Sequence, residues 1–183
     1  MYIAELKGKL SSRVAEKEDL LTSNVFSFLK YADRQQFLRP FLAQIGILLQ
    51  PDEAEQADFI FWPVFQDGTE PDLIIIAGRY YLLFEAKYGM TLFGQERGDM
   101  SDQLTREYDG GTDEAHNKNK EFHMFAITAD YSRQKKLAKM KSRIDFHWIN
   151  WQLITSFLER HIDIKGNAAL FAVDLYNLLV AHV

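Results

Sequence analysis

Two acidic residues stand at the ends of two strand-like stretches, at a spacing that could build a metal site. The stretches cover residues 73–76 and 80–86, and a turn at Gly78 separates them. Glycine in the first loop position is typical of a two-residue type II′ hairpin turn. Counting residues back along both strands from that turn places Asp72 directly opposite Glu85.

This predicted pair favours a divalent cation. Opposed residues of two antiparallel strands have Cβ atoms about 4.5–5.5 Å apart. Two carboxylates at that separation repel each other unless a cation lies between them or one of them is protonated. Carboxylate oxygens suit Mg²⁺ or Mn²⁺ better than zinc. Such an ion could polarise a phosphate group and generate hydroxide from water.

A lysine follows the second acid at a spacing that fits the same chemistry. Lys87 lies two residues after Glu85, so the pleat of the strand places both on one face of the sheet. There its charge could stabilise the attacking water or the transition state. A structural salt bridge between Lys87 and the two acids at the margin of the sheet is the alternative.

Two further polar residues could support this site. Glu18 belongs to a predicted helix over residues 16–31, and apolar residues follow it at three, seven and eleven positions. That period places Glu18 on the buried stripe of the helix, although an acid favoured by the helix dipole is the alternative. Gln103 lies on a predicted helix over residues 99–108 and could hold the lysine or a phosphate; a surface amide is the alternative.

Together these residues resemble a known family. Glu18, Pro71-Asp72, Glu85-Ala86-Lys87 and Gln103 look like the motif of the PD-(D/E)xK nuclease superfamily, which has the restriction-endonuclease-like fold. The resemblance covers roughly residues 16–149. It implies that Asp72 and Glu85, the Glu of the ExK element, bind Mg²⁺. It also implies that the Lys assists the attacking water, and that the helix Glu and the Gln support the site.

The predicted elements indicate an α/β protein. We expect a single domain over Met1–Val183, with a three-layer α/β/α arrangement in which helices flank a central mixed β-sheet. Besides the stretches above, strands are predicted at 59–65, 122–128 and 144–149, and helices at 41–49, 131–141, 150–160 and from 167 onward. We expect Gly110-Gly111 to close the helix that begins at residue 99, and Pro51 with the acidic run 52–58 to form a solvated connection.

Composition limits the classes of function. The 183 residues are enough for one well-filled core, and 47% of them are hydrophobic. There is no cysteine, which excludes thiolate metal sites, and no apolar run approaches the length of a membrane span. We therefore expect a cytoplasmic protein without a membrane partner.

The net charge of −5 argues against an all-over basic surface. One basic stretch could nevertheless line a phosphate-binding face, or form a solvated helix face; it contains Arg133, Lys135, Lys136 and Lys139.

These observations predict an endonuclease that uses one or two Mg²⁺ or Mn²⁺ ions. The ions would be held by Asp72, Glu85 and the main-chain carbonyl of Ala86, and DNA is the expected substrate, with RNA second. A homodimer would suit the cutting of both strands. Two alternatives stay open: an inactive module with a nuclease fold that binds nucleic acid or a partner protein, and a hydrolase of a small phosphorylated molecule.

Overall fold

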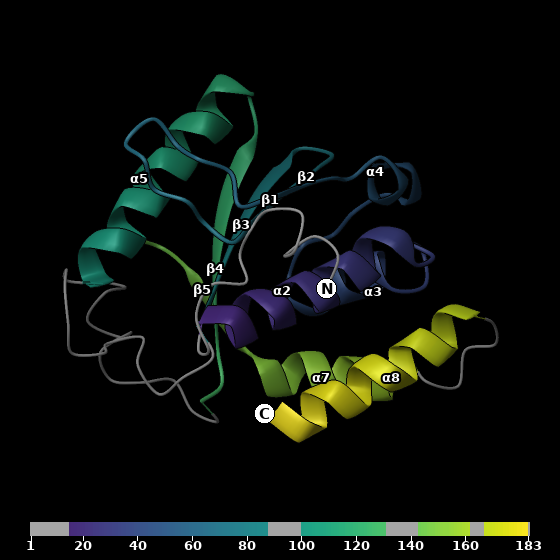
Figure 1. The fold of residues 1–183 in the computed structure, drawn as a ribbon. Helices are drawn as coiled ribbons and strands as arrows, with labels where there is room; N and C mark the ends of the chain where they lie inside the picture. Colours follow the sequence, from purple (N-terminus) through teal and green to yellow (C-terminus); the bar gives the residue numbers. More distant parts are fainter. Residues whose placement is uncertain (1–14, 88–99, 131–142, 162–166, 183) are drawn as a thin grey trace. The chain divides into compact units, whose positions relative to one another are not determined.

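The computed structural model describes residues 15–87, 100–130, 143–161 and 167–182, which form two compact units (Figure 1). One unit comprises Asp58–Asn150, and the other comprises Met1–Ala57 together with Trp151–Val183. No helix in the described part of the chain combines the length and the apolar character that crossing a membrane requires. The single domain expected from the sequence stays a prediction.

The unit Asp58–Asn150 is built on a mixed sheet of five strands in the order β1-β2-β3-β4-β5. Strands β1 (Asp58–Phe61), β2 (Leu73–Ala77) and β3 (Tyr80–Lys87) form an antiparallel meander. Strands β4 (Glu121–Thr128) and β5 (His147–Asn150) extend it in parallel. The predicted α/β class, with a mixed sheet and flanking helices, is confirmed.

The hairpin of β2 and β3 has the predicted register. Ala77 pairs with Tyr80 next to the turn, and Leu73 pairs with Phe84 at the far end. Gly78 has a φ of +53°, which the first loop position of a type II′ turn requires and which glycine adopts without steric cost. One further step along this register leads to the two acidic residues.

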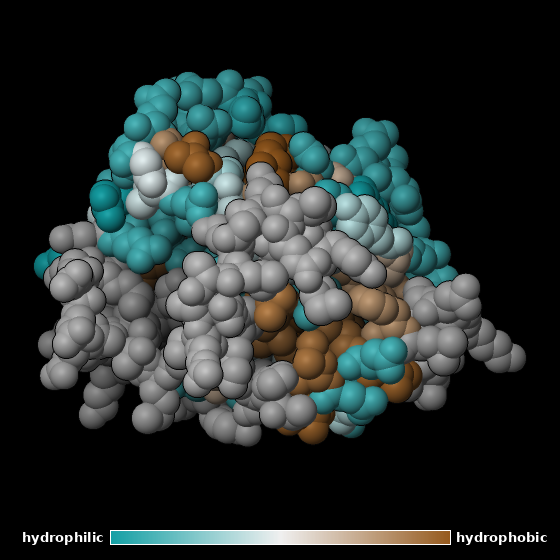
Figure 2. Space-filling model, in the orientation of Figure 1, coloured by the Kyte–Doolittle hydropathy of each residue, from teal (hydrophilic) through white to brown (hydrophobic). Residues whose placement is uncertain are grey.

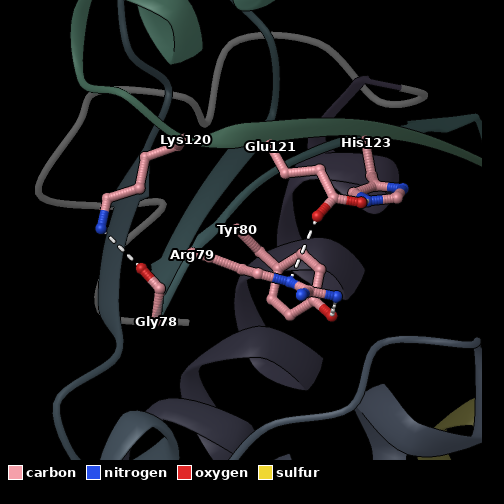
Figure 3. A network of polar contacts seen from close by, with 6 residues as sticks. All are labelled: Gly78, Arg79, Tyr80, Lys120, Glu121 and His123. Carbon is pink, nitrogen blue, oxygen red and sulfur yellow. Dashed lines mark hydrogen bonds and ion pairs between the residues drawn. The ribbon is translucent and has the colours of Figure 1, made fainter.

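Contacts with the start of β4 secure that turn (Figure 3). The Lys120 ammonium donates to the carbonyl oxygen of Gly78 at 2.5 Å, and the Arg79 guanidinium lies 3.2 Å from a carboxylate oxygen of Glu121. The other carboxylate oxygen of Glu121 lies 2.9 Å from His123 Nε2. These contacts hold the loop that sets the register of the hairpin.

Helix α5 (Met100–Asn117) connects β3 with β4 and packs on one face of the sheet. A parallel strand pair needs such a crossover connection. Buried Leu104 and Ala115 of the helix belong to one cluster with Tyr81, Leu83 and other residues of that face. The core below α5 therefore contains the odd-numbered positions of β3.

The predicted end of this helix at Gly110-Gly111 is wrong, because both glycines lie inside α5. A Cβ atom on Gly111 would lie 2.6 Å from the Phe122 ring, and one on Gly110 would lie 2.6 Å from the Phe65 ring. Each distance is far below van der Waals contact. The glycines thus allow the helix to approach the aromatic side chains closely, and this packing offsets their low helix propensity of about 1 kcal/mol each.

In the described residues of the second unit, the regular elements are all helices. They are α2 (Ala15–Tyr31), α3 (Leu38–Gln44), α4 (Pro51–Glu55), α7 (Trp151–Glu159) and α8 (Asn167–His182). Aromatic side chains join them: the rings of Phe41 on α3 and Phe157 on α7 meet edge to face at 5.5 Å. Such pairs stabilise a core beyond the area they bury.

Further predicted boundaries in these units need correction. The helix predicted at 41–49 is α3, which covers Leu38–Gln44. The acidic run after Pro51 is helix α4 and not a connection; Pro51 is its first residue, and the Gln50 N–H donates to Glu53 Oε2 at 2.7 Å. The strand predicted at 59–65 ends at Phe61, because Trp62 has a φ of +48° that breaks the ladder. The strand predicted at 144–149 is limited to His147–Asn150. The basic helix predicted at 131–141 lies outside the described residues.

Candidate active site

Asp72 and Glu85 lie side by side, and each accepts a hydrogen bond from the backbone beside the other. The Ala86 N–H donates to Asp72 Oδ2 at 2.7 Å, and the Asp72 N–H donates to Glu85 Oε2 at 3.2 Å. Hydrogen bonds from N–H groups to ionised carboxylates are about twice as strong as neutral ones. Both carboxylates are thus held in defined orientations at the end of the hairpin.

The local fold explains why these acids are buried. The carbonyl oxygen of Asp72 accepts a hydrogen bond from the Trp62 N–H at 3.0 Å, which ties the residue to the end of β1. Glu85 lies within β3, next to Ala126 of β4. Asp72 is 6% exposed and Glu85 is 1% exposed. Buried charges are costly unless other charges or hydrogen bonds compensate them. The burial of both acids therefore favours a specific role for the pair.

A side-chain amide from helix α5 completes the arrangement. Gln103 Nε2 donates to Glu85 Oε1 at 3.2 Å and to Glu107 Oε1 at 2.7 Å. Glu107 is fully buried, at 0% exposure. The structure therefore brings Gln103 next to Glu85, whereas the sequence suggested the lysine or a phosphate as its partner. It also adds a third buried carboxylate, Glu107, which was not predicted.

A signal for Glu107 was present in the sequence. It lies four residues after Gln103, three after Leu104 and four before Gly111, so it belongs to the buried stripe of α5. The same criterion selects Glu18 on its own helix. The helix predicted over residues 99–108 already contains Gln103, Leu104 and Glu107, so this stripe could have been recognised.

The other predicted residues are placed only in part. Lys87 is the last residue of β3 and pairs with Thr128, so its backbone position is on the same strand face as Glu85. Glu18 lies in α2, in the helical unit. The side chains of Lys87 and Glu18 lie outside the described part of the structure, and so do all four residues of the predicted basic face: Arg133, Lys135, Lys136 and Lys139.

Further polar groups lie at the carboxyl ends of the parallel strands, the end of the sheet at which Lys87 ends β3. Buried Thr128 ends β4, and its hydroxyl accepts a hydrogen bond from the Trp148 indole N–H at 3.1 Å. Asn150 ends β5, and its amide donates to the carbonyl oxygen of Asp130 at 3.1 Å. Ligands of open α/β sheets bind outside the carboxyl ends of the strands. Neither Thr128 nor Asn150 stands out in the sequence as a site residue.

The donors of the pair suit a hard divalent ion. Asp72 and Glu85 offer carboxylate oxygens on neighbouring strands, and Ala86 adds a main-chain carbonyl between Glu85 and Lys87. Within the described residues, no group of three or more His, Cys, Asp or Glu side chains is arranged to hold a metal. Mg²⁺ needs no such group, because it commonly binds one or two carboxylates and keeps several waters.

A cleft of about 550 Å³ lies between α5 and the β1–β2 connection, and neither Asp72 nor Glu85 lines it. Asp109, Asp113 and Glu114 line it on the helix, together with Arg106, and Asp67 lines it on the β1–β2 connection. The surface around α5 is mostly hydrophilic (Figure 2). This acidic lining would repel a phosphate backbone, so the cleft is a poor site for nucleic acid.

Comparison with known proteins finds similarity only at the level of solved structures. No protein-family model matches the sequence, and no curated protein matches it. Among solved structures, the chain is similar to the small subunit of a heterodimeric restriction endonuclease, with 12% sequence identity and a TM-score of 0.34. The match covers 89% of each chain. At this identity and TM-score the likeness carries no functional argument, and the function is argued from the geometry of the site.

Proposed function

We propose that this protein is a metal-dependent nuclease that hydrolyses phosphodiester bonds, with DNA as the preferred substrate and RNA second. One or two Mg²⁺ or Mn²⁺ ions would be held by Asp72, Glu85 and the main-chain carbonyl of Ala86. The observation that carries the proposal is the buried pair of carboxylates, each fixed by a backbone N–H of the neighbouring strand.

Each residue has a defined part in this proposal. The backbone hydrogen bonds orient Asp72 and Glu85 before any ligand binds, which lowers the cost of assembling the site. A bound divalent ion would polarise the phosphate and lower the pKa of a bound water. Lys87, at the end of the strand that carries Glu85, would stabilise negative charge on the attacking water or on the transition state.

The charge of the protein limits how it would bind nucleic acid. Its net charge is −5, so affinity for phosphates would depend on a bound cation and on a local basic face. The proposed face contains Arg133, Lys135, Lys136 and Lys139. Because phosphate contacts release counterions, binding through this face would weaken steeply as salt rises.

A nuclease assay tests the proposal. Wild-type protein and Lys87→Ala would be incubated with duplex, single-stranded and branched DNA and with RNA, in Mg²⁺, Mn²⁺ or EDTA. The matched control is Lys118→Ala, because Lys118 is a half-exposed lysine paired with Glu114 on α5. We expect cleavage that needs metal, persists in the control and disappears in Lys87→Ala.

Other outcomes separate the alternatives. If wild-type protein neither cuts any substrate nor binds a divalent ion, the enzyme proposal fails and the inactive binding module replaces it. If small phosphate esters are hydrolysed and nucleic acids are not, the substrate class in the proposal is wrong.

A further inference from the structure

The side-chain amide of Gln103 lies between two carboxylates on α5 and β3. Its nitrogen donates to Glu85 Oε1 at 3.2 Å and to Glu107 Oε1 at 2.7 Å. A primary amide has two N–H hydrogens, so these two contacts use both of them.

The direction in which this amide points decides how it acts on Glu85. Turned by 180° about its last torsion angle, the amide would present its oxygen to Glu85 Oε1, and two acceptors would face each other. An ionised carboxylate offers acceptors only. Glu107, at the shorter of the two distances, therefore favours the orientation in which the nitrogen faces both carboxylates.

Glu107 is well placed to fix this orientation. It is 0% exposed, so water competes little for its oxygens. It lies one helical turn after Gln103, the spacing at which two side chains of a helix meet. Its side chain is therefore oriented by the same helix that positions the amide, and the chain of contacts runs from Glu107 through Gln103 to Glu85.

We propose that Glu107 is a positioning residue of the metal site: it holds the Gln103 amide so that its N–H keeps Glu85 Oε1 in place for a divalent ion. This inference rests on the proposed function, because it assigns Glu85 to a metal. Residues that orient metal ligands from outside the coordination shell commonly contribute 10–100-fold to metal affinity or activity.

The test measures Mn²⁺ affinity by calorimetry for wild-type protein, Glu107→Gln and Glu107→Leu. Glutamine keeps an acceptor oxygen for the Gln103 amide, so we expect Glu107→Gln to stay within about threefold of wild type. Leucine fills a similar volume without an acceptor, so Glu107→Leu should bind about tenfold more weakly or worse. The matched control is Glu114→Gln, an acid of the same helix that lines the separate cleft, which should bind as wild type does.

A double-mutant cycle shows whether Glu107 acts through the amide. In a Gln103→Leu background, Glu107→Leu should lower Mn²⁺ affinity by little or nothing more, because the group it positions is already absent. Equal losses in both backgrounds would overturn the proposal. So would wild-type affinity in Glu107→Leu, or a loss in Glu107→Gln as large as in Glu107→Leu, which would point to charge instead of a hydrogen bond.

A readout without metal separates this inference from the proposed function. In wild-type protein in EDTA, the two Nε2 protons of Gln103 should exchange slowly with solvent and give NMR signals shifted from those of an exposed glutamine. These features should persist in Glu107→Gln and be lost in Glu107→Leu. If they behave so while wild-type protein binds no Mn²⁺, the proposed metal site fails and the orientation of the amide stands. If Mn²⁺ binds and the signals are the same in all three proteins, the positioning inference fails alone.

Discussion

Replacing Asp72 by Asn should raise stability without metal and abolish stabilisation by metal. If the two ionised carboxylates are separated by the same distance as the Cβ atoms of opposed strand residues, about 5 Å, their repulsion at an effective dielectric constant of about 20 is about 3 kcal/mol. In the wild-type protein the Ala86 N–H donates to Asp72 Oδ2 at 2.7 Å. The Asn side chain keeps an acceptor oxygen for this N–H, but the hydrogen bond is no longer to a charged group, which costs about 1 kcal/mol. The net gain is about 2 kcal/mol, or a melting temperature about 4–8 °C higher for a chain of this size.

Divalent metal should reverse this order. An ion at a hundred times its dissociation constant stabilises the folded protein by about 2.7 kcal/mol, which corresponds to about 5–11 °C for wild-type protein. Asp72→Asn lacks one of the two carboxylates and should show no such rise. The assay is thermal unfolding at pH 8 in EDTA and in rising Mg²⁺ or Mn²⁺, with Asp109→Asn, an exposed acid of the same helix as Gln103, as the control.

The opposite pattern would refute the reasoning. If the two acids form a structural ion pair with Lys87, Asp72→Asn should be less stable in EDTA by about 3–5 kcal/mol, because one partner of a buried pair is lost. Metal would then leave the wild-type melting temperature unchanged. That pair of results would remove the metal site from the account.

Three further predictions concern the frame of the site. Gly111→Ala should lower the free energy of unfolding by about 1–3 kcal/mol despite the better helix propensity of alanine, because the new Cβ would lie 2.6 Å from the Phe122 ring. Chemical denaturation measures this change, and a variant more stable than wild type would contradict the packing. Phe84→Ala removes a fully buried ring and should cost about 3–5 kcal/mol in the same assay, whereas a loss below 1 kcal/mol would show that the ring is not buried as described. The hydrogen bond from the Thr69 hydroxyl holds the pKa of Asp67 below its ordinary value. Thr69→Val should therefore raise that pKa in an NMR titration. The stability linked to this low pKa is present above the unfolded-state pKa and is lost as the pH falls through the folded-state pKa. An Asp67 pKa that is the same in Thr69→Val and in wild-type protein would contradict the hydrogen bond.

The hairpin that carries the candidate pair is predictable because its geometry leaves few choices. A two-residue turn at Gly78 allows one register, and the alternation of a strand then fixes which residues share a face. Asp72 and Glu85 follow from that count without knowledge of the rest of the fold. Gln103 is harder to predict. The sequence indicates the helix that carries it, but does not show whether its side chain faces the carboxylate pair or solvent.

The errors arise where distant residues decide local structure. Two adjacent glycines read as a helix end, since each is unfavourable in a helix, but here the rings of Phe65 and Phe122 require their small size. Helix α4 was missed because it has five residues and begins after Gln50, which is not among the usual N-cap residues.

The central claim is that Asp72 and Glu85 support metal-dependent hydrolysis of phosphodiester bonds. The most direct test compares single-turnover cleavage by wild-type protein and Glu85→Gln, in Mg²⁺ and in EDTA, on the best substrate from the nuclease assay. We predict that wild-type protein cuts only with metal, and that Glu85→Gln is slower by at least about a hundredfold, the upper range for groups that only support a ligand. Cleavage by Glu85→Gln at the wild-type rate, or cleavage by wild-type protein in EDTA, would contradict the account.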